Sequence, residues 1–172
     1  MGEGQATEME RREEFFKILQ DLEENPEIQK LRQYSQHRGN NTFQHCHNVA
    51  VYSFYLAEKW NWNVDLQSLA MGAMLHDYYL YGTKEASVNP YRHGITHPKT
   101  ALKNARERFE LDAKTENIIR SHMWPLSFLK WPHSKEALLI NIADKYCAFQ
   151  EISRGIRKIE RILERKKYYR LK

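Results

Sequence analysis

Apolar residues recur along most of this chain at the three- and four-residue spacing of a helix. The first predicted helix covers about residues 8–24, and Asn25-Pro26 ends it because proline disfavours helical backbone around itself. A second, short helix is predicted from residue 27 to about residue 36. The next segment, 37–42, has a polar, turn-forming composition and is expected to be a loop.

Two strongly patterned helices are predicted in the middle of the chain. Residues 43–60 place Val49, Tyr52 and Leu56 at helical spacing. Residues 66–79, which Asp65 is suited to cap, are apolar nearly all round. A helix without a polar face belongs in the core of a domain.

The second half of the chain is predicted to contain three more helices and one long loop. The loop covers 81–97, and Pro98 suits the first turn of a helix that runs to about residue 109. Another helix follows from about residue 115 and stops at Trp124-Pro125. The last begins after Ser134, a plausible N-cap, and extends to about Tyr168. About seven helices and no strand indicate an all-α, compact helical bundle that forms one domain over residues 1–172.

Composition agrees with an ordinary soluble domain. The chain has 172 residues, 41% of them hydrophobic and 28% charged, and only two cysteines. Its N-terminal segment lacks the apolar core of a secretion signal, and no apolar stretch is long enough to span a bilayer. We therefore expect a reduced, cytoplasmic protein without a membrane partner.

Charge is spread unevenly along the sequence. Residues 1–30 hold nine acidic and four basic side chains, whereas residues 154–172 hold nine basic and two acidic ones. Such a basic end segment is usually the solvated face of a terminal helix, although it could also attract phosphates or nucleic acid. The long terminal helix could also pair with a second subunit.

Six polar residues interrupt otherwise apolar segments, and they carry the candidate chemistry. These residues are His45, His76, Asp77, His97, His122 and Asp144. A buried imidazole or carboxylate is costly unless it is paired, hydrogen-bonded or bound to a metal. The six could therefore satisfy one another at one metal site, or each could be satisfied separately. Histidine and aspartate are suitable ligands for divalent metals, including two-metal centres in which one carboxylate bridges the ions.

The order of these residues resembles the HD-domain superfamily, which is named for an adjacent His-Asp pair. The segments HCHNVAVYS, AMGAMLHDYYLYG and NIADKYCAF resemble the family's first helix, its His-Asp helix and its closing helix. In the first segment His45, and not His47, has the family's spacing to the Val-Ala pair. HPKTALKNA and IIRSHMWP resemble two further histidine segments of the binuclear branch. The likeness covers residues 43–150, with N-terminal helices over 1–42 and a basic C-terminal helix extension over 151–172.

The resemblance implies an HD-domain helical bundle that hydrolyses phosphate esters or anhydrides with two divalent ions. His45, His76, Asp77 and Asp144 would hold one ion. Asp77, as the bridge, would hold the other with His97 and His122. His76 and Asp77 would be central to catalysis, and the metal could be Fe, Mn, Zn, Co or Mg.

Small bacterial HD hydrolases of this kind include some that cleave nucleotides or dinucleoside polyphosphates, so a nucleotide-type substrate is expected. His93, Arg92 and Lys99 are candidates for binding its phosphates. Two alternatives remain open. One is a mononuclear 5′-nucleotidase-like phosphatase in which His97 and His122 bind substrate. The other is a nucleotide-binding module without catalytic activity.

Overall fold

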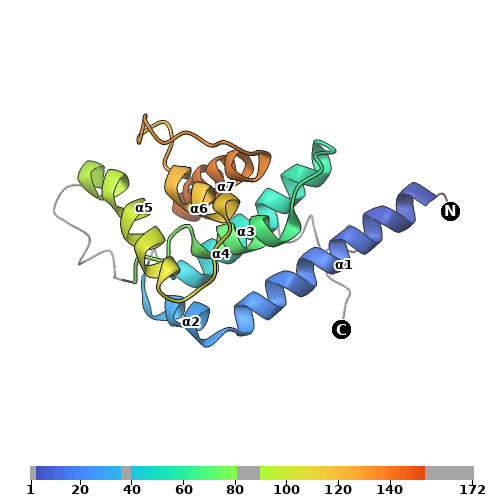
Figure 1. Cartoon of the computed structure of the whole chain (residues 1–172), viewed down its shortest axis with the longest axis horizontal. Coiled ribbons are helices and arrows are strands. Elements are labelled where there is room, and N and C mark those ends of the chain that lie inside the picture. Colours follow the sequence, from blue (N-terminus) through green and yellow to red (C-terminus); the bar gives the residue numbers. More distant parts are fainter. Residues whose placement is uncertain (1–2, 36–39, 81–89, 154–172) are drawn as a thin grey trace.

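The computed structural model describes residues 3–35, 40–80 and 90–153 (Figure 1). Its helices are α1 (Glu3–Glu24), α2 (Pro26–Gln29), the 3-10 helix η1 (Lys30–Gln33), α3 (Thr42–Lys59), α4 (Leu66–Leu75), α5 (Pro90–Arg106), α6 (Ala113–Ser121) and α7 (Lys135–Ser153). Within these ranges there is no strand, and one isolated bridge joins Ser35 to Asn41. The prediction of an all-α bundle is therefore confirmed. No described helix is both long enough and apolar enough to cross a membrane.

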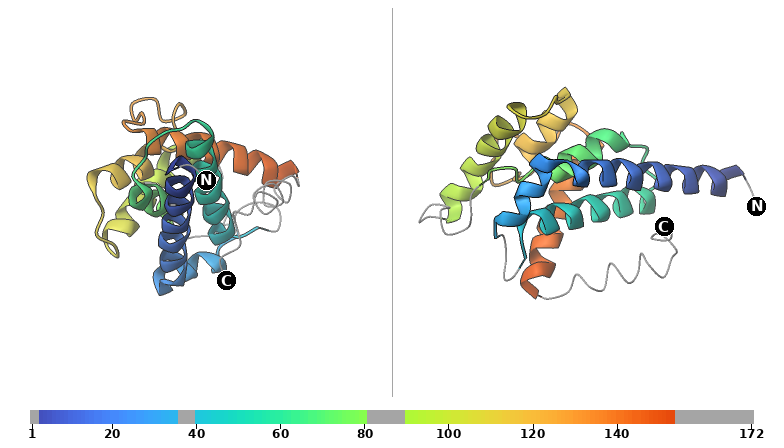
Figure 2. Two further views of the ribbon diagram at one scale, coloured as in Figure 1. Left: turned by 90° about the vertical axis from the view of Figure 1, so that its right-hand side faces the viewer. Right: turned by 90° about the horizontal axis from the view of Figure 1, so that it is seen from below.

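Helix α4 occupies the centre of the bundle, as its apolar sequence predicted. It contacts α1, α3, α5, α6 and α7. Helix α1 runs as a long rod beside it (Figure 2), with the Phe15 ring stacked on Phe54 of α3 at 4.2 Å between centroids. Gly72 of α4 permits close approach of α6, because a Cβ there would lie 2.7 Å from two side-chain atoms of Ile118.

Side-chain caps fix where the helices begin. Asn41, Asp65, Asp112 and Ser134 each accept a hydrogen bond from the backbone N–H three residues later, at 2.6–3.1 Å. Each bond satisfies one of the amide groups that a helix N-terminus leaves without an intrahelical partner. The predicted caps Asp65 and Ser134 are confirmed.

The predicted end of the central helix was too late. Helix α4 stops at Leu75 and not at Tyr79, and His76 is its C-cap. The chain then turns, with Leu80 at a φ of 56°. The Asn104 amide of α5 donates to the carbonyls of Tyr78 (3.2 Å) and Tyr79 (3.1 Å), so tertiary hydrogen bonds replace those of a longer helix.

The predicted start of the next helix was also wrong, because α5 begins at Pro90 and contains Pro98. A proline inside a helix removes one backbone hydrogen bond, and here the helix continues through it. The loop predicted over 81–97 is thus shorter, and residues 81–89 lie outside the described ranges. The short second helix is split into α2 and η1 and ends at Gln33. The last helix is described only to Ser153, so its predicted extension to Tyr168 stays a prediction.

Candidate metal centre

The six polar residues singled out in the sequence come together in the structure as two buried groups. One group is His45, His76 and Asp144, and the other is Asp77, His97 and His122. In each group, one potential ligand atom from every residue lies within 4.8 Å of the others. Five helices or their ends supply the side chains: α3, α4, α5, α6 and α7.

The first group is organised around Asp144 of α7. Its Oδ1 lies 3.1 Å from the Nε2 of His45 and 3.7 Å from the Nε2 of His76. The two imidazole Nε2 atoms are 3.3 Å apart. Two helices that pack on each other, α3 and α7, therefore place a carboxylate and an imidazole at the end of α4, where His76 follows its last turn.

The second group joins the ends of α4 and α6 to the middle of α5. The Nε2 atoms of His97 and His122 are 2.7 Å apart. Asp77 Oδ1 lies 3.2 Å from the His97 nitrogen and 3.5 Å from the His122 nitrogen.

Asp77 faces both groups at once. While its Oδ1 is directed to His97 and His122, its Oδ2 lies 3.6 Å from His76 Nε2 and 3.8 Å from His45 Nε2. One carboxylate that presents a different oxygen to each of two ligand groups has the geometry of a bridge between two cations.

Three of the histidines are oriented by their own helices. The Nδ1 atoms of His76, His97 and His122 lie 2.7, 3.0 and 2.9 Å from backbone carbonyls three or four residues earlier. Because a carbonyl only accepts, each Nδ1 must carry the proton and donate it. Their Nε2 atoms, when neutral, are then bare acceptors pointing into the centre.

His45 is oriented by a carboxylate instead. Its Nδ1 lies 3.1 and 3.2 Å from the two carboxylate oxygens of Glu151, and the Asn48 amide donates to the same carboxylate at 3.1 Å. The Glu151 side chain is only 3% exposed. A buried carboxylate behind a ligating imidazole fixes its tautomer and increases its basicity. We did not predict Glu151 from the sequence, although it lies seven residues after Asp144 and hence on the same face of α7.

The donor set fits divalent cations. Four Nε2 lone pairs and the oxygens of two carboxylates converge, and every one of them is an acceptor. Two bare nitrogens 2.7 Å apart repel each other unless a positive charge lies beside them. A mixed set of imidazole and carboxylate ligands suits divalent ions such as Mn, Fe, Zn or Co.

Without a metal, protons supply part of that positive charge. Burial lowers the pKa of His45, but hydrogen bonds to Asp144 and Glu151 outweigh burial and raise it to about 10. Burial and the neighbouring His97 and His76 lower the pKa of His122 to about 3. Burial raises the pKa of Asp77, yet the neighbouring His76 and His97 outweigh burial and hold that pKa well below its usual value.

Two side chains of α7 hold the segment that carries His122. The Asn141 amide donates to the carbonyls of His122 (2.7 Å) and Trp124 (2.6 Å). Lys145 Nζ donates to the same His122 carbonyl at 2.9 Å. Burial lowers the pKa of Lys145, although Asp144 opposes that shift. Neither residue was expected from the sequence, because a carbonyl that needs a donor leaves no trace in the side-chain pattern.

The structure brings only one of the predicted substrate-binding residues next to the centre. His93 is half-buried, with its ring stacked on His97 at 4.9 Å between centroids. Arg92 and Lys99 are exposed on α5. At about 100° per residue, Lys99 projects roughly 200° around the helix from His97, away from the centre. A contact of Arg92 or Lys99 with substrate therefore stays a prediction without support from this geometry.

Comparison with known proteins gives the class of this chain. The HD domain family matches residues 42–148, which is more than half of the sequence. The chain therefore belongs to the HD-domain family, whose members are generally metal-dependent phosphohydrolases. Comparison with curated proteins and with solved structures gave no match.

Proposed function

We propose that this protein is a phosphohydrolase that holds two divalent ions, one at His45, His76 and Asp144 and one at His97 and His122, with Asp77 as the bridge. The position of the Asp77 carboxylate supports this most directly. Its Oδ1 faces His97 and His122, and its Oδ2 faces His45 and His76. A single-ion site would need no second pair of bare imidazole nitrogens.

Bound ions would lower the pKa of a coordinated water and polarise a phosphoryl oxygen. The chain's own residues supply the geometry. Glu151 and the helix carbonyls fix which nitrogen of each histidine faces the centre. Asn104, by holding the carbonyls of Tyr78 and Tyr79, fixes the turn that aims Asp77.

For the substrate we propose a small phosphorylated molecule of the nucleotide type. His93 is the candidate contact, since it is half-buried and stacks on His97 at the edge of the centre. Burial and the neighbouring His97 lower its pKa, so the ring is neutral near pH 7 and would donate a hydrogen bond to a phosphate oxygen. Tyr79, in edge-to-face contact with His93 at 5.6 Å, backs this ring.

Elemental analysis joined to a hydrolysis assay tests the proposal. The purified chain should carry two divalent ions and release phosphate from members of a nucleotide panel with manganese or iron added. Asp77→Ala should lose both metal binding and hydrolysis, and His122→Ala should fall toward one ion per chain. His133→Ala, at an exposed histidine outside the centre, is the matched control and should leave both unchanged.

Other results would select the alternatives. One ion in the wild-type chain, unaffected by His122→Ala, would contradict the two-ion site and favour a mononuclear phosphatase. Nucleotide binding without turnover at full metal loading would favour a binding module. Full metal content in Asp77→Ala would show that the bridge is wrongly assigned.

A further inference from the structure

The connection between α6 and α7 exposes an unusual concentration of large apolar side chains. Phe128 is 77% exposed, Leu129 is 91% exposed and Trp131 is 63% exposed. The connection projects from the body of the bundle (Figure 1). Exposed apolar residues are ordinary when scattered, but three within four positions mark a contact surface.

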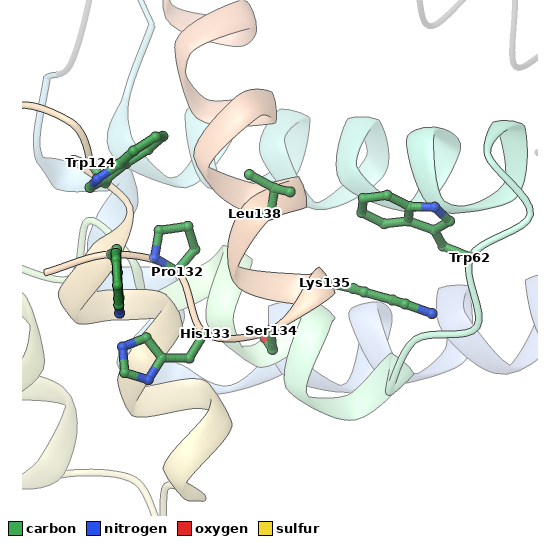
Figure 3. Close-up of a pocket in the computed structure, with 8 residues that line it drawn as sticks. Trp62, Trp124, Pro132, His133, Ser134, Lys135 and Leu138 are labelled. Atoms are coloured by element: carbon green, nitrogen blue, oxygen red, sulfur yellow. The ribbon is translucent and has the colours of Figure 1, made fainter.

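A second connection brings aromatic rings to the groove that Trp131 lines. Trp62, in the turn between α3 and α4, lines a shallow groove together with Trp131, Trp124 and Leu138 (Figure 3). The groove has a volume of about 410 Å³. The ring of Trp60 lies 5.2 Å from that of Trp62. We call the five side chains Trp60, Trp62, Phe128, Leu129 and Trp131 the apolar rim.

The charged residues of the segment that carries Phe128, Leu129 and Trp131 are of one sign. Residues 117–135 contain Arg120, Lys130 and Lys135 and no acidic residue. The acidic side chains nearest along the chain are paired within the domain, Glu116 with Arg106 at 2.6 Å and Glu136 with Lys114 at 3.3 Å. Beside Trp60 and Trp62, the acidic Glu58 and Asp65 are paired with Arg11 and Lys114. Phe128, Leu129 and Trp131 therefore lie in a segment whose charged residues are all cationic, which is complementary to an anionic surface.

This pattern of charged and apolar side chains distinguishes between three kinds of partner that could cover the apolar rim: a second copy of the chain, a nucleic acid and a lipid bilayer. A second copy packed symmetrically on the α6–α7 connection would bring the Lys130 and Lys135 side chains of both copies into one interface, with no acidic residue from 117–135 to pair with them. A nucleic acid would use the flat tryptophan rings but not the aliphatic tip of Leu129. A bilayer with anionic headgroups can use the aliphatic and phenylalanine side chains, the tryptophan rings and the lysines together. Leucine and phenylalanine enter the acyl boundary, tryptophan lies at the headgroup level and lysine pairs with phosphate.

We propose that the apolar rim docks this protein peripherally on anionic lipid bilayers. The sequence-based expectation of no membrane partner rested on the absence of an apolar span, and a peripheral contact needs none. The proposal does not depend on the reaction at the metal centre, because the rim contains none of the six candidate ligands.

Vesicle sedimentation tests the proposal. The full chain should sediment with vesicles of mixed phosphatidylglycerol and phosphatidylcholine and not with pure phosphatidylcholine. Its tryptophan emission should shift to shorter wavelength on binding. The double variant Phe128→Ser/Leu129→Ser should bind at least about tenfold more weakly, since each large apolar side chain withdrawn from water contributes about 1.5–3 kcal/mol. Met9→Ser, which alters a side chain that is 60% exposed on α1, should bind as the wild type does.

Three outcomes would overturn the proposal. The wild-type chain could stay in the supernatant with anionic vesicles. The double variant could bind as tightly as the wild type, which would assign binding to the basic 154–172 segment. Sedimentation equilibrium could instead reveal a dimer that Leu129→Ser dissociates, which would make the rim a subunit interface. Far-UV circular dichroism and metal content should be the same in all variants, so loss of folding is recognisable.

Discussion

At the scale of single residues, the candidate metal centre depends on side chains that are not themselves candidate ligands. Six candidate ligands converge there, and each of them interrupts an apolar pattern in the sequence. What the pattern could not reveal is how they are held. Glu151, Asn141 and Lys145 act on other side chains or on backbone carbonyls, and on a helix surface such residues look like ordinary solvated positions.

Glu151 gives a residue-scale prediction that separates orientation from ligation. Glu151→Gln keeps the shape but weakens the charge-assisted hydrogen bond to His45 Nδ1. We expect metal affinity to fall about 10- to 100-fold, as is usual when a partner behind a ligand is lost. Isothermal titration of the metal-free chain with Mn²⁺ measures this. Glu107→Gln, at an exposed position, should leave the affinity unchanged, and equal affinities in the two variants would contradict a role for Glu151.

At the scale of elements, helix starts were easier to predict than helix ends. Caps such as Asp65 and Ser134 act within three residues, so local sequence reveals them. The end of α4 depends on Asn104, which lies nearly thirty residues later, and no local pattern contains that information. The start of α5 was misplaced because Pro98 suits a first turn, yet the helix tolerates it in its interior.

The crossing of α4 and α6 gives an element-scale prediction. Gly72→Ala would place a Cβ 2.7 Å from Ile118 Cδ1 and Cγ2, so the buried Ile118 side chain or the two helices must shift. We expect a loss of about 1–3 kcal/mol in the free energy of unfolding. Weaker binding of the ion proposed at Asp77, His97 and His122 should follow, since α4 leads into Asp77 and α6 into His122. Urea denaturation measures the first effect. Gly72→Ala/Ile118→Val removes one of the two contacts and should recover part of the loss, whereas an unchanged single variant would contradict close packing here.

The N-cap of α6 gives a second element-scale prediction, in which the free energy of unfolding depends on pH. Asp112 accepts from the Thr115 N–H at 2.6 Å and from the Ser68 hydroxyl at 2.8 Å. Asp112→Ala should cost about 1 kcal/mol in the free energy of unfolding. Asp112→Asn, which keeps an acceptor, should cost less.

Protonation of Asp112 should remove the extra free energy of unfolding that the wild type has over Asp112→Asn. Burial raises the pKa of Asp112, but hydrogen bonds from Thr115 outweigh burial and lower it in the folded chain. The stabilisation by its charge is therefore complete above the unfolded pKa of about 3.9 and is lost as pH falls through the lower folded pKa. Urea denaturation of the wild type and Asp112→Asn from pH 7 to pH 3 measures this. A difference that grows toward pH 3 would have the wrong sign.

At the scale of the whole molecule, the all-α bundle followed from helical periodicity and the absence of strand patterns. The arrangement of α3, α4 and α7 around the centre did not follow from periodicity. It came from the resemblance, which fixed the order of the motifs but not the distances between them. The apolar rim was not predicted, because the sequence pattern does not distinguish an exposed apolar side chain from a buried one, and only the structure shows that Phe128, Leu129 and Trp131 are exposed.

Metal removal is the prediction that concerns the whole chain. Ions that bind only the folded state stabilise it, by about 2.7 kcal/mol per site at a free concentration of roughly 100 times Kd. We expect the unfolding midpoint to rise on adding Mn²⁺ to the chelated protein and to fall again with excess EDTA. Differential scanning calorimetry measures the shift. It should be smaller in His122→Ala, and identical midpoints with and without metal in the wild type would count against ion binding by the folded state.

The two ligand groups rest on parts of the bundle that differ in how firmly they are anchored. His45, His76 and Asp144 come from α3, α4 and α7, which pack directly on one another, whereas His97 comes from α5, which reaches the bundle through α6 and the end of α4. Local opening of a protein begins in its least packed elements. The centre should therefore assemble and come apart in sequence, with amide exchange in α5 running ahead of that in α4. If two ions bind as proposed, the ion beside His97 should be the last to be captured and the first to be released.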